Sequence, residues 1–190
     1  MNWPILHLND LLNILSSLKP ITKYYYITAL LASNCGLRIG EICGLKWTDI
    51  DFKKNTIKIE RQLKQDKDKK WVLGTLKSSN SYRTVPLPAL VKNDLLNYQK
   101  TMPVDINGLI INKSVDTVAN NISKLFKKNG YSISIHELRH TYATLLIANG
   151  IDFKTAAKLL GHDVKETIKT YSHVNDEMLN NAKNIIEKIF

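Results

Sequence analysis

The 190-residue chain has few of the residues that organise secreted, membrane-bound or unstructured proteins. Its two cysteines, Cys35 and Cys43, cannot build a disulfide framework and have no neighbours at metal-ligand spacing. With only 8 glycines and 5 prolines, a disordered or collagen-like chain is excluded. No window approaches the ~18 uninterrupted apolar residues of a membrane span, and the N-terminus lacks a basic region followed by an apolar one. We therefore expect a cytoplasmic protein that does not bind membranes.

Acidic residues are also in deficit, because 27 Lys and Arg face 17 Asp and Glu, which gives a formal net charge of +10. A surplus of this size attracts polyanions such as nucleic acids. Arginine is scarce among these cations and occurs only at positions 38, 61, 83 and 139. A planar guanidinium can hold two oxygens of one phosphate, which lysine cannot do. The few arginines are therefore candidates for phosphate contacts.

The apolar pattern changes period along the chain. Helical spacing covers residues 8–34 with a break at Pro20, and a short third helix ends at Gly44. Short strand-like runs then follow at 56–59, 71–73 and 84–87, which predict a three-stranded antiparallel meander. Further helices are expected near residues 89–101, 115–128, 136–149, 153–160, 164–171 and 175–189.

This order predicts an α+β fold that is mainly α-helical with a small three-stranded antiparallel sheet. We expect one domain over residues 1–174. Residues 175–190 form an amphipathic tail helix in the same unit, because their apolar residues recur at helical spacing.

Polar residues able to act on a phosphate gather in short segments. His136 and Arg139 are three residues apart, so on a helix an imidazole and a guanidinium share one face. The segments are Gly36–Glu41, Leu76–Ser79 followed by Tyr82–Pro86, His136–His140, Leu160–His162 and Thr170–Val174.

In kind and order, these segments resemble the catalytic domain of the tyrosine recombinase (phage integrase) family. The resemblance runs from about Leu31 to Val174 and includes the Leu-Gly-His run before Tyr171. It implies an integrase that cleaves and rejoins DNA through a 3′-phosphotyrosine, without metal, cofactor or ATP. The catalytic residues it implies are Arg38, Lys77, His136, Arg139, His162 and Tyr171, with Glu41 supporting Arg38.

The chemistry requires these residue types. A tyrosine hydroxyl has a pKa of ~10 and must approach an anionic phosphate. Two arginines can neutralise that phosphate and stabilise the charge of the transition state. In this scheme His136 accepts the proton of Tyr171, and Lys77 protonates the departing 5′-oxygen. His162 donates a hydrogen bond to the phosphate.

Double-stranded DNA is the expected partner, and the resemblance implies self-association on DNA, as a tetramer, with the C-terminal tail as a possible contact. The Lys, Ile and Asn bias favours a bacterial or phage source.

Only 37 residues precede Arg38, too few for a separate helical clamp domain, so weak DNA binding is expected of this chain alone. His140 and His173 are interpreted either as structural residues or as residues that support the catalytic ones. Candidate contacts with the DNA backbone are Lys64, Arg83, Lys127 and Lys128.

Three alternatives compete with this interpretation. His136, Glu137 and His140 also match the His-Glu-x-x-His pattern of zinc peptidases, but no further motif supplies a third ligand. A relative that binds DNA without cutting it would be favoured if any of the six catalytic residues were replaced, and none is. A type IB topoisomerase would share much of the chemistry, but the match around Arg38, His136 and Tyr171 favours a recombinase.

Overall fold

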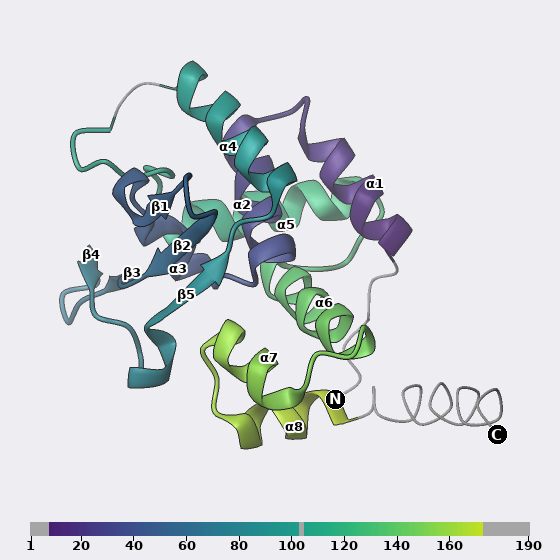
Figure 1. The fold of residues 1–190 in the computed structure, drawn as a ribbon. Helices are drawn as coiled ribbons and strands as arrows, with labels where there is room; N and C mark the ends of the chain where they lie inside the picture. Colours follow the sequence, from purple (N-terminus) through teal and green to yellow (C-terminus); the bar gives the residue numbers. More distant parts are fainter. Residues whose placement is uncertain (1–7, 103–104, 173–190) are drawn as a thin grey trace, which may run out of the picture.

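The computed structural model describes residues 8–102 and 105–172, and its elements follow the expected order of helices, strands and helices (Figure 1). The predicted α+β class is confirmed. The elements are α1 (Leu8–Leu18), α2 (Lys23–Cys35), α3 (Ile39–Gly44), η1 (Trp47–Asp49), β1 (Ile50–Asp51), β2 (Thr56–Ile59), β3 (Gln62–Gln65), β4 (Trp71–Gly74), η2 (Ser79–Ser81), β5 (Arg83–Pro86), α4 (Ala89–Thr101), α5 (Val115–Lys128), α6 (Ile135–Ala148), α7 (Phe153–Leu160) and α8 (Val164–Tyr171). The tail 175–190 and His173 lie outside the described residues.

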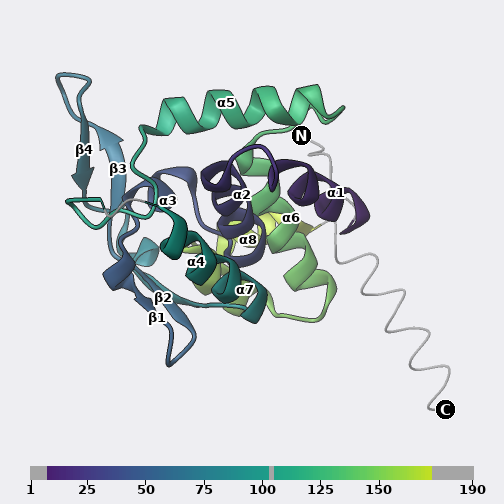
Figure 2. The same ribbon diagram turned by 90° about the horizontal axis from the view of Figure 1, so that it is seen from above.

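Helix α2 is the centre of the fold. Its residues from Tyr25 to Cys35 are buried, with the exception of Asn34, which is partly exposed. A helix that is buried on all sides needs neighbours all round it. Helices α1, α4 and α6 pack against α2, and α3 follows it directly (Figures 1 and 2).

The turn from α2 into α3 requires glycine. Gly36 ends α2 with a positive φ of 66°, and a Cβ at this position would lie 2.5 Å from the ring of Tyr142 on α6. Only glycine adopts this backbone conformation without cost and also leaves room for the ring. The turn brings Arg38, the N-cap residue of α3, next to α6.

The sheet differs from the predicted meander. The meander would place the strand at 71–73 between the other two, but β2 pairs directly with β5, with Ile57 opposite Val85, and the third strand is β1, which has two residues. The predicted strand at 71–73 lies in β4, which pairs with β3 in a separate hairpin. Val72 and Leu73 are 36% and 39% exposed. These apolar side chains are not buried in the core. Their pattern in the sequence therefore did not indicate that β4 pairs with β3 rather than with β2 and β5.

Helices α7 and α8 form a small layer against α6, at the bottom of Figure 1. Gly161 ends α7 in the left-handed conformation, with a φ of 65°, and the chain turns directly into α8. A separate apolar cluster joins the three helices and consists of Ala143, Ile147, Ala156, Leu160 and Tyr171.

Candidate active site

A cleft of about 430 Å³ lies where α3, α6, α7 and α8 meet the segment between β4 and β5. Four of the predicted catalytic residues line this cleft: Arg38, Lys77, His136 and His162. The other two, Arg139 and Tyr171, are 1% and 2% exposed and do not line it. Each is hydrogen-bonded to a histidine that does, Arg139 to His162 and Tyr171 to His140. The structure therefore brings all six residues to one place, with two of them behind the wall.

Glu41 is the acidic centre of the site. Its side chain is 1% exposed and accepts hydrogen bonds from both Arg38 and Arg83. The bond from Arg38 is 2.8 Å, and the two from Arg83 are 2.8 Å and 3.0 Å. Oε2 of Glu41 also accepts a hydrogen bond from the backbone N–H of Arg38 and so caps the start of α3. Glu41 thus fixes Arg38 by its backbone and its side chain together, as the predicted support for this arginine requires.

The end of α7 is held by three of the four arginines. The last carbonyl groups of a helix have no partner within the helix and carry its negative dipole end. Leu159 O accepts Arg83 Nε at 2.7 Å, Leu160 O accepts Arg139 at 2.5 Å, and Gly161 O accepts Arg38 at 3.0 Å. Three successive carbonyls therefore each bind a different guanidinium. This arrangement fixes the spacing of Arg38 and Arg139, which lie on different helices.

Arg139 is held on all sides. It donates to Gly36 O, to Leu160 O and to Nε2 of His162, the last at 2.8 Å. Burial lowers the pKa of Arg139 to about 9, and the nearby charge of Arg38 contributes to the shift. The guanidinium therefore remains a cation at neutral pH. Because it donates to His162, it also fixes the orientation of that ring in the cleft wall.

Tyr171 is withdrawn from the cleft. Its ring packs in the cluster between α6, α7 and α8, and its hydroxyl lies 2.6 Å from Nδ1 of His140. Burial raises the pKa of Tyr171 to about 12, so the phenol is protonated at neutral pH. The sequence interpretation placed the proton acceptor at His136 and gave His140 a structural or supporting role. In the structure it is His140 that meets the hydroxyl.

The cleft histidines are kept neutral. Burial and the charge of Arg139 lower the pKa of His162 to about 3. Burial, together with His136 and Arg139, lowers the pKa of His140 to about 4. The pKa of His136 is also lowered, first by burial. Neutral imidazoles can accept protons, which protonated ones cannot do.

The predicted DNA-backbone contacts have two outcomes. The prediction for Arg83 is wrong, because its side chain is 2% exposed and paired with Glu41. The sequence alone did not indicate that the side chain of Arg83 would be buried and paired with Glu41. Lys64 on β3 and Lys127 and Lys128 at the end of α5 are exposed, so their contacts with DNA stay a prediction.

The zinc-peptidase alternative does not fit the geometry. Glu137, its expected base, accepts hydrogen bonds from the backbone and hydroxyl of Ser134 and caps α6. His140 is engaged with Tyr171. Over residues 8–102 and 105–172, no group of three His, Cys, Asp or Glu side chains is placed to hold a metal ion. The same residues include no helix long and apolar enough to cross a membrane.

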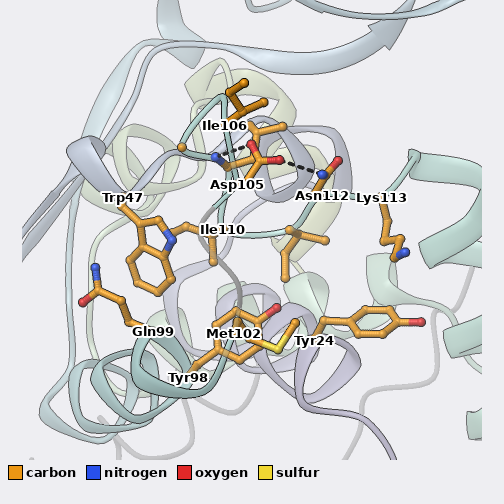
Figure 3. Close-up of a pocket in the computed structure, with 13 residues that line it drawn as sticks. Tyr24, Trp47, Tyr98, Gln99, Met102, Asp105, Ile106, Ile110, Asn112 and Lys113 are labelled. Atoms are coloured by element: carbon orange, nitrogen blue, oxygen red, sulfur yellow. Dashed lines mark hydrogen bonds between the residues drawn. The ribbon is translucent and has the colours of Figure 1, made fainter.

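A larger cavity of about 540 Å³ lies elsewhere, between the ends of α2 and α4 and the loop before α5 (Figure 3). Its lining includes Tyr24, Trp47, Tyr98 and Met102. Asp105 closes one side by accepting a hydrogen bond from Asn112 at 2.6 Å. None of the predicted catalytic residues lines it. The cationic cleft, although smaller, is therefore the candidate active site.

Curated proteins with similar sequences are tyrosine recombinases. A tyrosine recombinase XerC-like protein of Caldanaerobacter subterraneus is 32% identical over 85% of this chain and 48% of its own length. The tyrosine recombinase XerA of Thermococcus onnurineus is 32% identical over 90% of this chain and 58% of its own length. The chain thus spans about half the length of these curated relatives.

Structural similarity extends over the whole chain. The Tn1549 transposon integrase in complex with circular intermediate DNA has a TM-score of 0.82 at 20% identity, covering 100% of this chain and 68% of that one. A XerA recombinase crystal structure has a TM-score of 0.76 at 22% identity, covering 96% of this chain and 66% of its own. At this identity they show a shared fold. The model of the phage integrase family matches residues 6–178, and the chain therefore belongs to this family of tyrosine recombinases.

Proposed function

We propose that this chain cleaves and rejoins double-stranded DNA through a covalent 3′-phosphotyrosine on Tyr171. The observation that carries the proposal is the cleft itself. Arg38, Lys77, His136 and His162 line it, while Arg139 and Tyr171 lie directly behind its histidines. Several relatives of this fold are integrases or recombinases bound to DNA, which supports DNA as the substrate.

Two arginines neutralise the phosphate in this reaction. Arg38 is partly exposed in the cleft, with 32% of its side chain accessible, and Arg139 lies behind it. Arg38 binds the non-bridging oxygens from the cleft, and the charge of Arg139 behind the wall adds to the stabilisation of the negative charge that grows in the transition state. Hydrogen bonds to Glu41 and Gly161 O fix Arg38 before DNA binds, and hydrogen bonds to Gly36 O, Leu160 O and His162 fix Arg139. These fixed cations supply the charge that other enzymes obtain from a metal ion.

The remaining cleft residues handle protons and orientation. Lys77 is exposed on the segment after β4 and protonates the departing 5′-oxygen. His136 and His162 hydrogen-bond to the phosphate from the cleft wall. Tyr171 must move toward the cleft before it attacks, because the ring of His140 lines the cavity and the phenol does not. The phosphotyrosine conserves the energy of the cleaved bond, so rejoining needs no ATP.

Assembly and location complete the proposal. The catalytic unit covers residues 1–174, and residues 175–190 form a tail helix that contacts a neighbouring copy in a tetramer on DNA. Lys64, Lys127 and Lys128 contact the DNA backbone, and the protein acts in the cytoplasm. The net charge of +10 supports binding to a polyanion.

Covalent capture tests this function. The chain is incubated with a pool of nicked duplexes of randomised sequence, in which the cleaved end diffuses away and cannot be rejoined. We expect a chelator-resistant adduct whose 3′-phosphate is attached to Tyr171, located by mass spectrometry and absent in Tyr171→Phe. An adduct that persists in Tyr171→Phe, or that a chelator abolishes, contradicts the proposal. Binding of the pool without any adduct favours a relative that binds DNA without cutting it.

A further inference from the structure

The contact between His140 and Tyr171 joins the nucleophile to a group outside the expected catalytic set. Nδ1 of His140 lies 2.6 Å from the hydroxyl of Tyr171, and the two ring centroids are 5.7 Å apart. A general base has to lie within about 2.6–3.2 Å of the atom that gives up the proton. His140 on α6 meets this distance requirement for Tyr171 on α8.

The protonation states at neutral pH set which group donates and which accepts in the contact between Tyr171 and His140. His140 is neutral at pH 7, because burial and the adjacent His136 and Arg139 lower its pKa to about 4. Tyr171 keeps its proton, because burial raises its pKa to about 12. The phenol O–H therefore donates and Nδ1 accepts, which places the imidazole proton of His140 on Nε2. A neutral acceptor is already aligned with the proton that must leave.

His136 stands one helical turn earlier on α6. Its ring packs edge-on against His140, with centroids 4.4 Å apart at an interplanar angle of 78°. Both rings line the cleft, but it is the second that is hydrogen-bonded to the nucleophile. The packing of His136 also fixes the plane of the His140 ring and hence the direction of Nδ1. The geometry therefore places His140 at the nucleophile and leaves His136 facing the cleft, where the phosphate binds in the proposed reaction.

We infer that His140, rather than His136, accepts the proton of Tyr171 during DNA cleavage, an inference that rests on the proposed function. The Tyr171 Oη–P bond forms as the P–O5′ bond breaks, and the phenol proton passes to Nδ1 of His140. Lys77 supplies one proton to the departing 5′-oxygen, so the two transfers balance. Rejoining reverses both transfers and returns His140 to its neutral form.

Nitrogen NMR of the full chain tests the contact without DNA. With ¹⁵N-labelled histidine, the signals of His140 are assigned from their loss in His140→Asn. We expect a neutral ring at pH 7 with the proton on Nε2, and a shift of the Nδ1 signal in Tyr171→Phe. A ring protonated on Nδ1, or an Nδ1 signal unchanged by Tyr171→Phe, overturns the inference. This result does not depend on whether the chain cleaves DNA.

The rate of adduct formation tests the proton transfer itself. His140→Asn keeps a hydrogen-bond acceptor near the position of Nδ1 but cannot take up a proton. We expect it to form the Tyr171 adduct about 100-fold more slowly, since general base catalysis contributes roughly 10²–10⁴-fold. A fluorinated tyrosine at position 171 ionises more readily, and it should recover most of this loss. A purely structural role of His140 would not be rescued in this way.

His136→Asn is the matched control, one turn away on the same helix. We expect it to slow the reaction as well, but with no rescue by the fluorinated tyrosine, because it acts on the phosphate. Rescue in His136→Asn and not in His140→Asn overturns the inference and makes His136 the acceptor. A rate for His140→Asn within two-fold of the unsubstituted chain also overturns it. Either result leaves the Tyr171 adduct, and thus the proposed function, intact.

Discussion

The arginine cluster around Glu41 and the site that holds Tyr171 are built in opposite ways. Glu41 is almost fully buried and pairs with Arg38 and Arg83, while three arginines take the last carbonyls of α7. Tyr171 instead packs in a small apolar cluster at the end of α8, with its hydroxyl on His140. The charges that stabilise a phosphate are thus fixed before DNA arrives, whereas the phenol of the nucleophile, bonded to His140, still has to turn toward the cleft that the His140 ring lines.

The largest expected effect comes from removing the charge at the centre of the cluster. Glu41→Gln leaves Arg38, Arg83 and Arg139 close together without their carboxylate. We expect the free energy of unfolding to fall by about 3–5 kcal/mol, the range typical when one partner of a buried ion pair is lost. Urea denaturation followed by circular dichroism measures this change.

Glu60→Gln is the control for that experiment. Glu60 pairs with Lys58 at the surface, where its side chain is 38% exposed, and such pairs contribute little to stability. We expect no measurable change in its unfolding curve. If Glu41→Gln behaves like Glu60→Gln, the arginine cluster is not the rigid frame described here.

Acid should weaken the cluster in a defined pH range. Burial alone would raise the pKa of Glu41, but hydrogen bonds and charge from Arg83, with Arg139 and Arg38, lower it from 4.5 to about 2. A group whose pKa is lowered by folding stabilises the protein above its unfolded pKa, and the effect is lost as pH falls through the folded pKa. The free energy of unfolding should therefore decline between about pH 4.5 and 2. The Glu41→Gln variant should lack this part of the decline, and parallel curves for the two proteins would contradict the assignment.

Much of the fold could be predicted because helical periodicity is a local signal. The helices expected at 89–101, 115–128, 153–160 and 164–171 agree with α4, α5, α7 and α8. Strand pairing is a long-range property, and there the prediction was wrong. The sheet takes Ile50–Asp51 as its third strand, which is too short to produce a pattern, while the exposed strand Trp71–Gly74 joins a separate hairpin.

The sequence predicted which residues form the site better than it predicted which of them bond to each other. Spacing and resemblance indicated six residues that the fold does bring together. They could not indicate that Arg83 would be buried against Glu41, since this pair joins β5 to α3 across 42 residues. The same holds for His140, whose contact with Tyr171 depends on the packing of α8 against α6. A histidine five residues into a helical motif carried no signal for that contact.

The smallest expected effect tests the other half of the comparison. Tyr171→Phe keeps the buried ring but removes the hydrogen bond to His140. A single hydrogen bond contributes about 1 kcal/mol net to the free energy of unfolding. Its loss should therefore lower Tm by about 2–4 °C in a protein of this size. Differential scanning calorimetry measures the shift, and Tyr82→Phe, at a tyrosine that is 47% exposed, is the control expected to leave Tm unchanged. A loss as large as that of Glu41→Gln would place Tyr171 within the rigid frame. A small loss is what a nucleophile requires if it is to exchange this hydrogen bond for a bond to phosphorus.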